Sequence, residues 1–449
     1  MSLHAYPEYR SSGVSWLGDV PTHWGVNRMK WSVDSSQNGI WGEEPDGGAD
    51  DVRCVRVADF DRPKLRIQDR DITYRKVRPS DQRGRLLSKG DLILEKSGGG
   101  EKNPVGFVVL YDRAEPAVTS NFLARVTLKP GMDSRYWSYL HSSLYQSRLT
   151  QPSIKQTSGI QNLDQQSYFD EVVCFPPARE QRGIADFLDD ETAKIDALIA
   201  KQEQLIATLR EDRTATITNA VTKGLDPHVE LKDSGVKWIG DVPSHWSVPQ
   251  IGMHAVIGNG STPARDEPRY WSGGAVPWLN SSHVNKEEIA EADQFVTNAA
   301  FRECHLPMVS AGSVLVGLTG QGKTRGMASV LLIQSTINQH LAYITPIDRH
   351  LDGRYIQRVL ASAYGLLREL SDENGSTKGG LTCATLRKVR TPLPPMSEQR
   401  DIVEHVQQKC SAIDALIAKA TRMIETLREY RSALITDAVT GKIDVRGVA

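Results

Sequence analysis

The chain has 449 residues, of which 39% are hydrophobic and 24% charged, and its formal net charge at pH 7 is -1. This length allows two or three domains with buried cores, and the composition is typical of soluble proteins. The sequence contains no run of eighteen apolar residues, so it predicts no transmembrane helix. Because the chain is nearly neutral, it has no global electrostatic attraction to nucleic acid.

The N-terminal segment and the cysteines indicate the cellular compartment. Residues 1–16 lack the apolar stretch of a secretory signal. The five cysteines are scattered and form no C-x-x-C pair: Cys54, Cys174, Cys304, Cys383 and Cys410. An odd, dispersed set favours a reducing cytoplasm over a disulfide framework or a zinc site. We therefore expect a cytoplasmic protein without a metal ion or cofactor of its own.

The first motif is a word that contains glycine and tryptophan. Residues 12–24 read S-G-V-x-W-x-G-D-V-P-x-H-W, and residues 234–246 repeat this word. His23 and His245 could act as ligands or bases, but no Cys, Asp or second His repeats with them. We therefore expect each histidine to pack with its neighbouring tryptophan at a domain boundary.

The segment from residue 53 to residue 102 is locally basic. It holds fourteen Lys or Arg against eight Asp or Glu, a net charge of about +6. Such a segment is either a solvated surface or, beside glycine loops, a face that follows a phosphate backbone.

Two variable regions, residues 25–175 and 247–392, follow the two copies of the tryptophan word. Both contain short β-type runs separated by glycines, then a helical segment and a polar loop with glycine. The predicted strands lie at 91–94, 106–110, 123–126, 313–316, 328–333 and 341–344, the helices at 134–149 and 352–370, and the loops at 155–163 and 376–381. We infer that the two regions share a scaffold and bind two different ligands through the same geometry.

A long helical segment occurs twice, at residues 180–222 and 398–440. The copies share the words E-Q-R, I-D-A-L-I-A-K and T-L-R-E in one register without insertions, which indicates an internal duplication. The expected boundary residues are a proline pair before each helix, an N-cap in the second and a glycine after each: Pro176, Pro177, Pro394, Pro395, Ser397, Gly224 and Gly441.

Apolar residues of both segments recur at steps of three, four and seven. They are Leu188, Ile195, Leu198, Leu205, Leu209 and Ile217, then Val406, Ile413, Leu416, Met423, Leu427 and Leu434. Such a narrow stripe is the seam of a helix that pairs with another helix. A helix of about 43 residues is about 65 Å long, more than a globular domain needs. Either each helix packs on its own domain, or the two stripes face each other as an antiparallel pair that separates two domains.

Residues 317–324, G-L-T-G-Q-G-K-T, match the P-loop pattern of nucleotide-binding proteins. A P-loop opens a helix, whereas the following residues predict a strand. Residues 97–102 of the first variable region, S-G-G-G-E-K, form no P-loop at the matching place. We therefore interpret the motif as a hairpin tip that displays Lys323 and Arg325 to a phosphate backbone.

Signatures of catalysis are missing elsewhere. The sequence has no G-x-G-x-G methyl-donor loop, no N-P-P-aromatic motif, no nuclease motif, no G-x-S-x-G and no H-E-x-x-H. The carboxylates Asp59, Asp61, Asp189 and Asp190 are interpreted as helix-start or surface charges. We therefore expect a non-catalytic chain.

With the repeated helices, the proline pair before E-Q and the G-D-V-P-x-H-W word, the whole chain resembles the specificity (S) subunit of type I restriction-modification systems. The resemblance implies an α+β fold, with two β-rich mixed α/β target-recognition domains in tandem, separated by two long helices that form an antiparallel coiled coil. The implied boundaries are 1–177 and 225–395 for the recognition domains, and 178–224 and 396–449 for the spacer helices and C-terminal tail.

The resemblance also implies the partners. They are double-stranded DNA, two methyltransferase (modification) subunits and, in the full assembly, endonuclease/translocase subunits that carry the catalysis. Because the two variable regions differ, we expect an asymmetric, bipartite target with a gap between its halves.

Arg, Lys, Asn and Gln side chains discriminate bases in the major groove, although each can instead contact a phosphate. The residues expected to contact DNA are Lys96, Lys102, Asn103, Lys155, Gln156, Gln161 and Asn162 in the first region, and Thr262, Arg265, Asn280, Gln321, Lys323, Arg325 and Lys378 in the second. Two alternatives stay open. A coiled-coil adaptor would assemble without sequence preference, and a P-loop NTPase would lose hydrolysis on Lys323→Ala.

Overall fold

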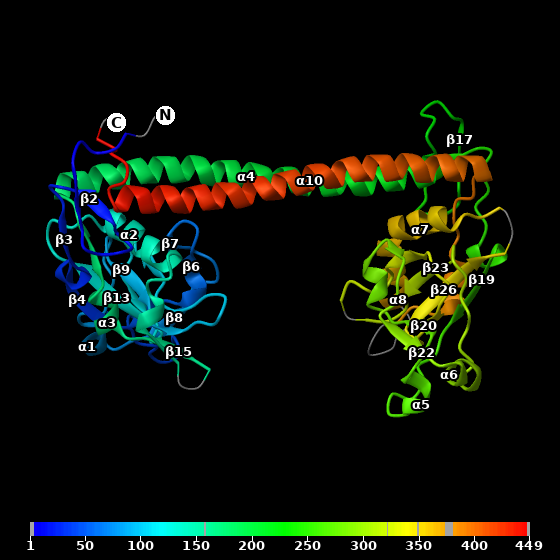
Figure 1. The fold of residues 1–449 in the computed structure, drawn as a ribbon, viewed down its shortest axis with the longest axis horizontal. Helices are drawn as coiled ribbons and strands as arrows, with labels where there is room; N and C mark the ends of the chain where they lie inside the picture. The colour runs from blue at the N-terminus through cyan, green and yellow to red at the C-terminus, as the bar shows by residue number, and fades with distance from the viewer. Residues whose placement is uncertain (1–3, 157–158, 321, 348–349, 373–379, 447–449) are drawn as a thin grey trace. The chain divides into compact units, whose positions relative to one another are not determined.

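The computed structural model describes residues 4–156, 159–320, 322–347, 350–372 and 380–446. The chain divides into two compact units. The first unit comprises residues 1–202 and 422–449, and the second comprises residues 203–421. Each unit therefore contains one recognition domain and one part of each long helix (Figure 1). No helix among the described residues is both long and apolar enough to cross a membrane.

The two long helices are α4, Ala178–Lys223, and α10, Met396–Val439. Both begin directly after the proline pair. The backbone N–H of Gln399 donates to the carbonyl of Pro395 at 3.0 Å, which makes Pro395 the capping position. The expectation that Ser397 caps this helix is therefore wrong. Gly224 and Gly441 follow the C-terminal ends with φ of 75° and 74°, the left-handed conformation expected of a helix stop.

Within each unit the two helices run antiparallel and are joined by an ion pair. In the first unit Arg431 Nε lies 3.0 Å from Asp196, and in the second Arg213 Nε lies 3.1 Å from Asp414. These pairs occupy equivalent positions of the duplicated sequence. The predicted α+β fold with two recognition domains and an antiparallel helix pair is confirmed.

The seam between the helices differs from the predicted stripe at four positions. Leu198, Leu205, Leu416 and Met423 are 44–52% exposed, whereas Leu188, Ile195, Ile217, Val406, Ile413 and Leu434 are buried and Leu209 and Leu427 half-buried. Each exposed residue is followed by an isoleucine, and that isoleucine is buried or half-buried instead. Two adjacent apolar residues cannot both face a narrow seam, and periodicity alone selected the wrong member of each pair.

Each recognition domain is built on an antiparallel core of four strands with a fifth strand parallel to its edge. In the first unit the order is β4-β13-β9-β11-β7-β6, and in the second it is β19-β26-β23-β24-β21. The strands of the first are Val33–Asn38, Leu123–Leu128, Leu92–Glu95, Val108–Leu110, Arg66–Ile67 and Phe60–Asp61. Those of the second are Ala255–Asn259, Leu341–Pro346, Val314–Gly317, Ala328–Leu331 and Glu288–Ile289. The six predicted strands are all present.

A three-stranded sheet accompanies each large sheet, with the orders β12-β5-β8 and β22-β20-β25. These strands are Ala117–Thr119, Asp51–Val55 and Tyr74–Lys76, then Gln294–Val296, Val276–Leu279 and Thr336–Ile337. The first unit adds a small sheet β10-β15-β14, formed by Ser97–Gly98, Gln161–Leu163 and Ile154–Gln156. The duplicated topology confirms that the two variable regions share a scaffold.

One helix of each domain faces the long helices. This is α2, Ser134–Gln146, in the first unit and α7, Gly353–Ser362, in the second, where α8, Tyr364–Asp372, continues the predicted segment after a break. The remaining short helices are Pro79–Gln82, Gln165–Phe169, Pro268–Trp271, Asn298–Glu303 and Cys383–Lys388.

The repeated words E-Q and H-W meet where each domain joins its long helix. Glu180 accepts hydrogen bonds from the Trp24 indole at 3.0 Å and lies 2.8 Å from His23 Nε2. Glu398 contacts Trp246 at 2.9 Å and His245 at 2.8 Å in the same way. The expected packing on the neighbouring tryptophan is found for His245, whose ring centre lies 6.3 Å from that of Trp246, whereas the His23 ring lies 5.8 Å from Tyr6. The repeated partner that sequence inspection missed is this glutamate.

The glutamine next to this glutamate holds the helix of each domain that faces the long helices, α2 or α7. The Gln181 side chain accepts from the Asp133 backbone N–H at 3.0 Å and donates to the Pro176 carbonyl at 2.9 Å. Gln399 does the same with Asp352 and Pro394, at 2.9 Å each. Asp133 and Asp352 are the N-caps of α2 and α7. The E-Q residues therefore hold both the H-W residues of the repeated tryptophan motif and the N-terminus of α2 or α7.

Candidate nucleic-acid interface

Three segments meet beside the strand β9 in the first unit and beside β23 in the second. In the first, the Lys96 N–H donates to the Phe122 carbonyl at 3.0 Å, and the Lys96 carbonyl accepts from Leu163 at 2.8 Å. In the second, Leu318 donates to His340 and accepts from Leu381, at 2.9 Å each. The same backbone frame therefore presents two different sets of side chains.

We call the place where the three segments meet beside β9 the first reading end, and its counterpart beside β23 the second. The first reading end contains most of the residues expected there. Lys102, Asn103 and Gln156 are exposed, and Lys96 is half-buried, where burial lowers its pKa. Asn162 accepts a hydrogen bond from Ser97 at 2.7 Å and remains exposed.

Two other expected residues of this end have partners within the domain. Lys155 forms a 2.6 Å ion pair with Asp164. Gln161 is buried, and its side-chain oxygen accepts from the Val105 N–H at 3.3 Å. Because Gln161 supports the glycine loop from inside, the structure does not place it as a base contact.

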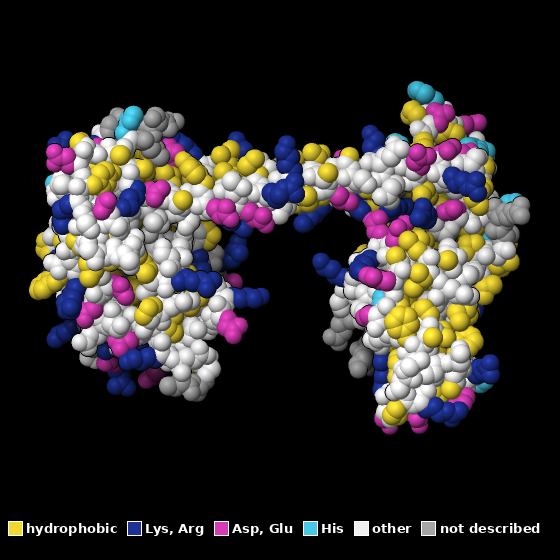
Figure 2. Space-filling view, in the orientation of Figure 1, with side chains coloured by type: hydrophobic (Ala, Val, Ile, Leu, Met, Phe, Trp, Pro, Cys, Tyr) yellow, Lys and Arg dark blue, Asp and Glu magenta, His cyan; other side chains and the backbone are white. Residues whose placement is uncertain are grey.

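The basic segment is largely paired inside the first domain. Its arginines and lysines contact carboxylates at 2.5–3.2 Å in the pairs Arg53–Asp69, Arg56–Asp59, Arg62–Glu95, Arg66–Asp112, Arg75–Glu44 and Lys76–Asp46. Figure 2 likewise shows Lys and Arg side chains interspersed with Asp and Glu over the visible face. The local excess of positive charge therefore does not form one uninterrupted basic surface on this face.

The second reading end differs more from expectation. Lys323 is exposed, but Arg325 is only 7% exposed and its guanidinium pairs with Asp372 at 2.7 Å. The prediction that Arg325 is displayed at a hairpin tip is therefore wrong. Strand β24 follows this loop, so no helix receives a phosphate there and the P-loop interpretation fails on its context. Gln321 and Lys378 lie outside the described residues.

The remaining three expected residues are held by local contacts. Thr262 donates to the Gln339 side chain, and Asn280 accepts from Ser282 at 2.6 Å. The Arg265 guanidinium lies over the rings of Trp271 and Trp278, 4.1 and 4.6 Å from their centres. Arg265 is thus fixed in place by cation–π contacts before any ligand arrives.

Sequence inspection missed the residues on the turn before the strands β13 and β26. Phe122 is 45% exposed in the first unit, and His340 takes its place in the second, where His340 Nδ1 lies 2.8 Å from Thr319 Oγ1. The signal was available, since Leu123 and Leu341 begin equivalent strands of the duplicated sequence.

No group of His, Cys, Asp or Glu with the geometry of a metal site occurs among the residues that the structure describes. The cysteines are unpaired, and burial raises the pKa of Cys54 to about 11 and that of Cys174 to about 12.

Comparisons with known proteins agree on one family. Residues 243–425 match the model described as "Type I restriction modification DNA specificity domain". The chain is 22% identical over 442 residues to the "Putative type I restriction enzyme MjaX specificity subunit" of Methanocaldococcus jannaschii, covering 96% of each. It is 21% identical over 338 residues to the type I restriction enzyme EcoKI specificity subunit of Escherichia coli K12, covering 74% of this chain and 67% of that protein.

Solved structures share the fold at lower identity. A chain from a structural study of complex assembly in a type I restriction-modification system superposes with a TM-score of 0.71 at 17% identity, covering 94% of this chain and 98% of that one. The HsdS subunit from Thermoanaerobacter tengcongensis gives 0.56 at 15% identity, with the same coverage. Residues 243–425 thus carry a type I restriction modification DNA specificity domain, and over nearly its whole length the chain is similar to type I restriction enzyme specificity subunits.

Proposed function

We propose that this chain recognises an asymmetric, bipartite DNA sequence with a gap between its halves, and directs partner methyltransferase subunits to it. Each recognition domain reads one half through its three segments at the β9 or β23 end. The chain supplies the reading surface and the spacer, whereas the partners supply the methyl donor and the catalytic residues.

The observation that carries this proposal is the contrast between a shared frame and different side chains. Lys96 and Phe122 stand in the first unit where Leu318 and His340 stand in the second. Base edges in the major groove are discriminated by the donors, acceptors and apolar groups that face them. Two reading ends with different chemistry therefore accept two different half-sites.

The exposed apolar residues of the helices support docking of the methyltransferase partners. Leu198 and Met423 are about half exposed in the first unit, and Leu205 and Leu416 in the second. Leu198 corresponds to Leu416 in the duplicated sequence, and Leu205 corresponds to Met423, so each unit carries an equivalent patch. Two equivalent patches suit two copies of one methyltransferase subunit, and the endonuclease subunits of a full assembly would join that complex.

The test is a methylation map of DNA from a host that expresses this chain with its methyltransferase, compared with a host that lacks only this chain. We expect one bipartite, gapped motif with two different halves, present only with the chain. An unchanged map, obtained while the complex is shown to assemble, would favour a coiled-coil adaptor that does not read DNA.

A further inference from the structure

Arg213 and Arg431 occupy equivalent positions, and each joins three elements. Besides its aspartate on the other long helix, each guanidinium reaches into a recognition domain. Arg431 Nη2 donates to the Pro63 carbonyl at 2.6 Å, and Arg213 Nη2 donates to the Glu287 carboxylate at 2.5 Å. The repeat therefore has one arginine at each junction of helix pair and domain, with a neutral acceptor in the first unit and a charged one in the second.

In the second unit Glu287 is the centre of an ionic network. It accepts from Arg213 on one oxygen and from Arg358 of α7 on the other, at 2.5 and 2.7 Å. Arg358 also donates to Gln407 of α10 at 2.7 Å, and its side chain is only 7% exposed. The Glu287 carboxylate thus bridges Arg213 of α4 and Arg358 of α7, and each of these arginines also contacts α10.

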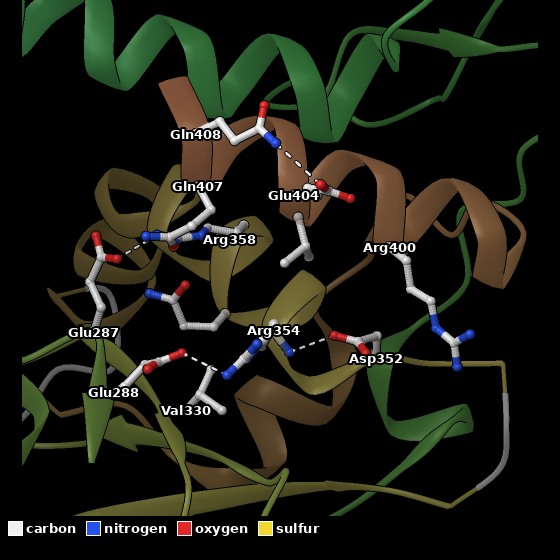
Figure 3. A pocket seen from close by; sticks show the side chains of 12 residues that line it. Glu287, Glu288, Val330, Asp352, Arg354, Arg358, Arg400, Glu404, Gln407 and Gln408 are labelled. Atoms are coloured by element: carbon white, nitrogen blue, oxygen red, sulfur yellow. Dashed lines mark hydrogen bonds and ion pairs between the residues drawn. The ribbon is translucent and has the colours of Figure 1, made fainter. Parts of the chain in front are cut away.

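A cavity of about 740 Å³, lined mainly by charged and amide side chains, lies beside this network, between α7 and α10. Figure 3 shows Arg354 and Arg358 extending from α7 toward Glu288 and Glu287, with Gln407 above them on α10. The apolar residues of this unit form separate clusters on the two sides. Ile356 and Leu360 of α7 belong to the sheet cluster, whereas Tyr355 and Val359 belong to the cluster of the long helices.

The first unit is joined differently. A single apolar cluster runs from the strands β9 and β11 through α2 to Leu188 and Ile195 of α4 and Leu434 of α10. Tyr139 of α2 adds a 2.8 Å hydrogen bond to Asp189 of α4. Continuous apolar packing resists rotation of the first domain, so its arginine is one restraint among several.

We infer that Arg213 and Glu287 are positioning residues that hold the second recognition domain at one angle on its helix pair, and thereby restrict the gap at which the second half-site is accepted. The inference rests on the proposed function. A guanidinium can bond two acceptors in a fixed geometry, which a lysine ammonium cannot reproduce. After either partner is removed, the domain is still held on the long helices by the apolar contacts of Tyr355 and Val359 of α7, but the ionic link between Glu287 and α4 is lost.

The test measures binding by the complex of full chain and methyltransferase to three duplexes. All carry the methylated motif found for the wild type, with its native gap or with one base pair more or fewer. For Arg213→Ala and for Glu287→Gln we expect the preference for the native gap to fall about tenfold, while the preferred letters of both half-sites stay unchanged. Arg431→Ala should lower the preference by no more than about threefold, and Arg210→Ala, an exposed residue one helical turn away, should leave it unchanged.

Three outcomes would overturn the inference. An equal loss of affinity for all three duplexes would show a merely structural role, and altered letters would place Arg213 in base reading. A larger effect of Arg431→Ala than of Arg213→Ala would contradict the assigned difference between the units. If the wild-type complex binds no bipartite motif, the proposed function fails and not the positioning role.

Discussion

The two units present one design with two kinds of junction. In the first, an unbroken apolar cluster connects the sheet, α2 and the long helices. In the second, the sheet and the long helices have separate apolar clusters, α7 contributes residues to each of them, and charged residues around a cavity add an ionic link. The contacts made by the repeated words are nevertheless the same in both. The comparison shows that duplication kept the attachment points, while the interior of the junction and the reading end diverged.

The largest expected effect tests the shared attachment. Trp24 and Trp246 are each 1% exposed, and each donates to the glutamate of its long helix. Replacing either by alanine should lower the free energy of unfolding by about 3–5 kcal/mol, because a large buried ring is lost. Circular dichroism during chemical denaturation measures this loss. Trp31→Ala, at a 54% exposed position, is the control and should change little. Losses that differ strongly between Trp24→Ala and Trp246→Ala would show that the attachments are not equivalent.

Replacing the glutamine of the E-Q motif should lower the free energy of unfolding by a smaller amount. Gln181→Ala and Gln399→Ala should each cost about 1–3 kcal/mol, because buried backbone groups lose their partners. Gln399 also donates to the His350 carbonyl at 2.7 Å, so its loss should be the larger. Hydrogen exchange at the N-termini of α2 and α7 would report the loss locally. Faster exchange in α2 than in α7 would contradict this order.

The ion pairs of Glu287 should make the stability of the second unit depend on pH. Burial raises the pKa of Glu287, but Arg213 and Arg358 outweigh burial, so its pKa is lowered. The stabilisation is therefore present above the ordinary glutamate pKa of about 4.3 and is lost as the pH falls through the lower folded-state value. Since Glu287 is partly exposed, Glu287→Gln should cost about 1 kcal/mol or less at pH 7.

The measurement is the unfolding free energy of Glu287→Gln and wild type from pH 7 to pH 3. Their difference should shrink toward the acidic end. Glu288→Gln, which removes the carboxylate that pairs with the 55% exposed Arg354, is the matched control. A difference that grows as the pH falls would mean that the arginines do not stabilise the charged form.

The smallest effect concerns the reading ends. Phe122 offers an apolar ring where His340 offers ring nitrogens, and phenylalanine can contact the methyl group of thymine. Replacing thymine by deoxyuracil at one position of the first half-site should weaken binding about fourfold, the value of one methyl group. Phe122→Ala should abolish this sensitivity, and the second half-site should not show it. Equal sensitivity in Phe122→Ala and wild type would assign the methyl contact to another residue.

Sequence patterns predicted the parts of the fold that depend on repetition and periodicity. The long helices, their stops at Gly224 and Gly441 and the six strands follow from local preferences that tertiary contacts reinforce. The seam was misassigned where Leu198 precedes Ile199 and Leu416 precedes Ile417, because only the partner helix decides which of two adjacent apolar residues is covered.

The reading ends were less predictable for a different reason. Residue type indicates that Arg325 and Gln161 can contact DNA, but not that Asp372 or the Val105 N–H already binds them. Such pairings join residues 47 and 56 positions apart, so they exist only after folding. Phe122 escaped notice because an apolar residue beside a strand predicts core.

The most direct test of the account replaces the second variable region, residues 247–392, by a copy of the first, residues 25–175. Because α2 and α7 are attached through equivalent contacts, the copy should dock on the second helix junction. We predict a methylated motif that contains the first half-site twice and no second half-site. A motif that still contains the second half-site, from a variant that folds and assembles, would contradict the claim that each domain reads its own half.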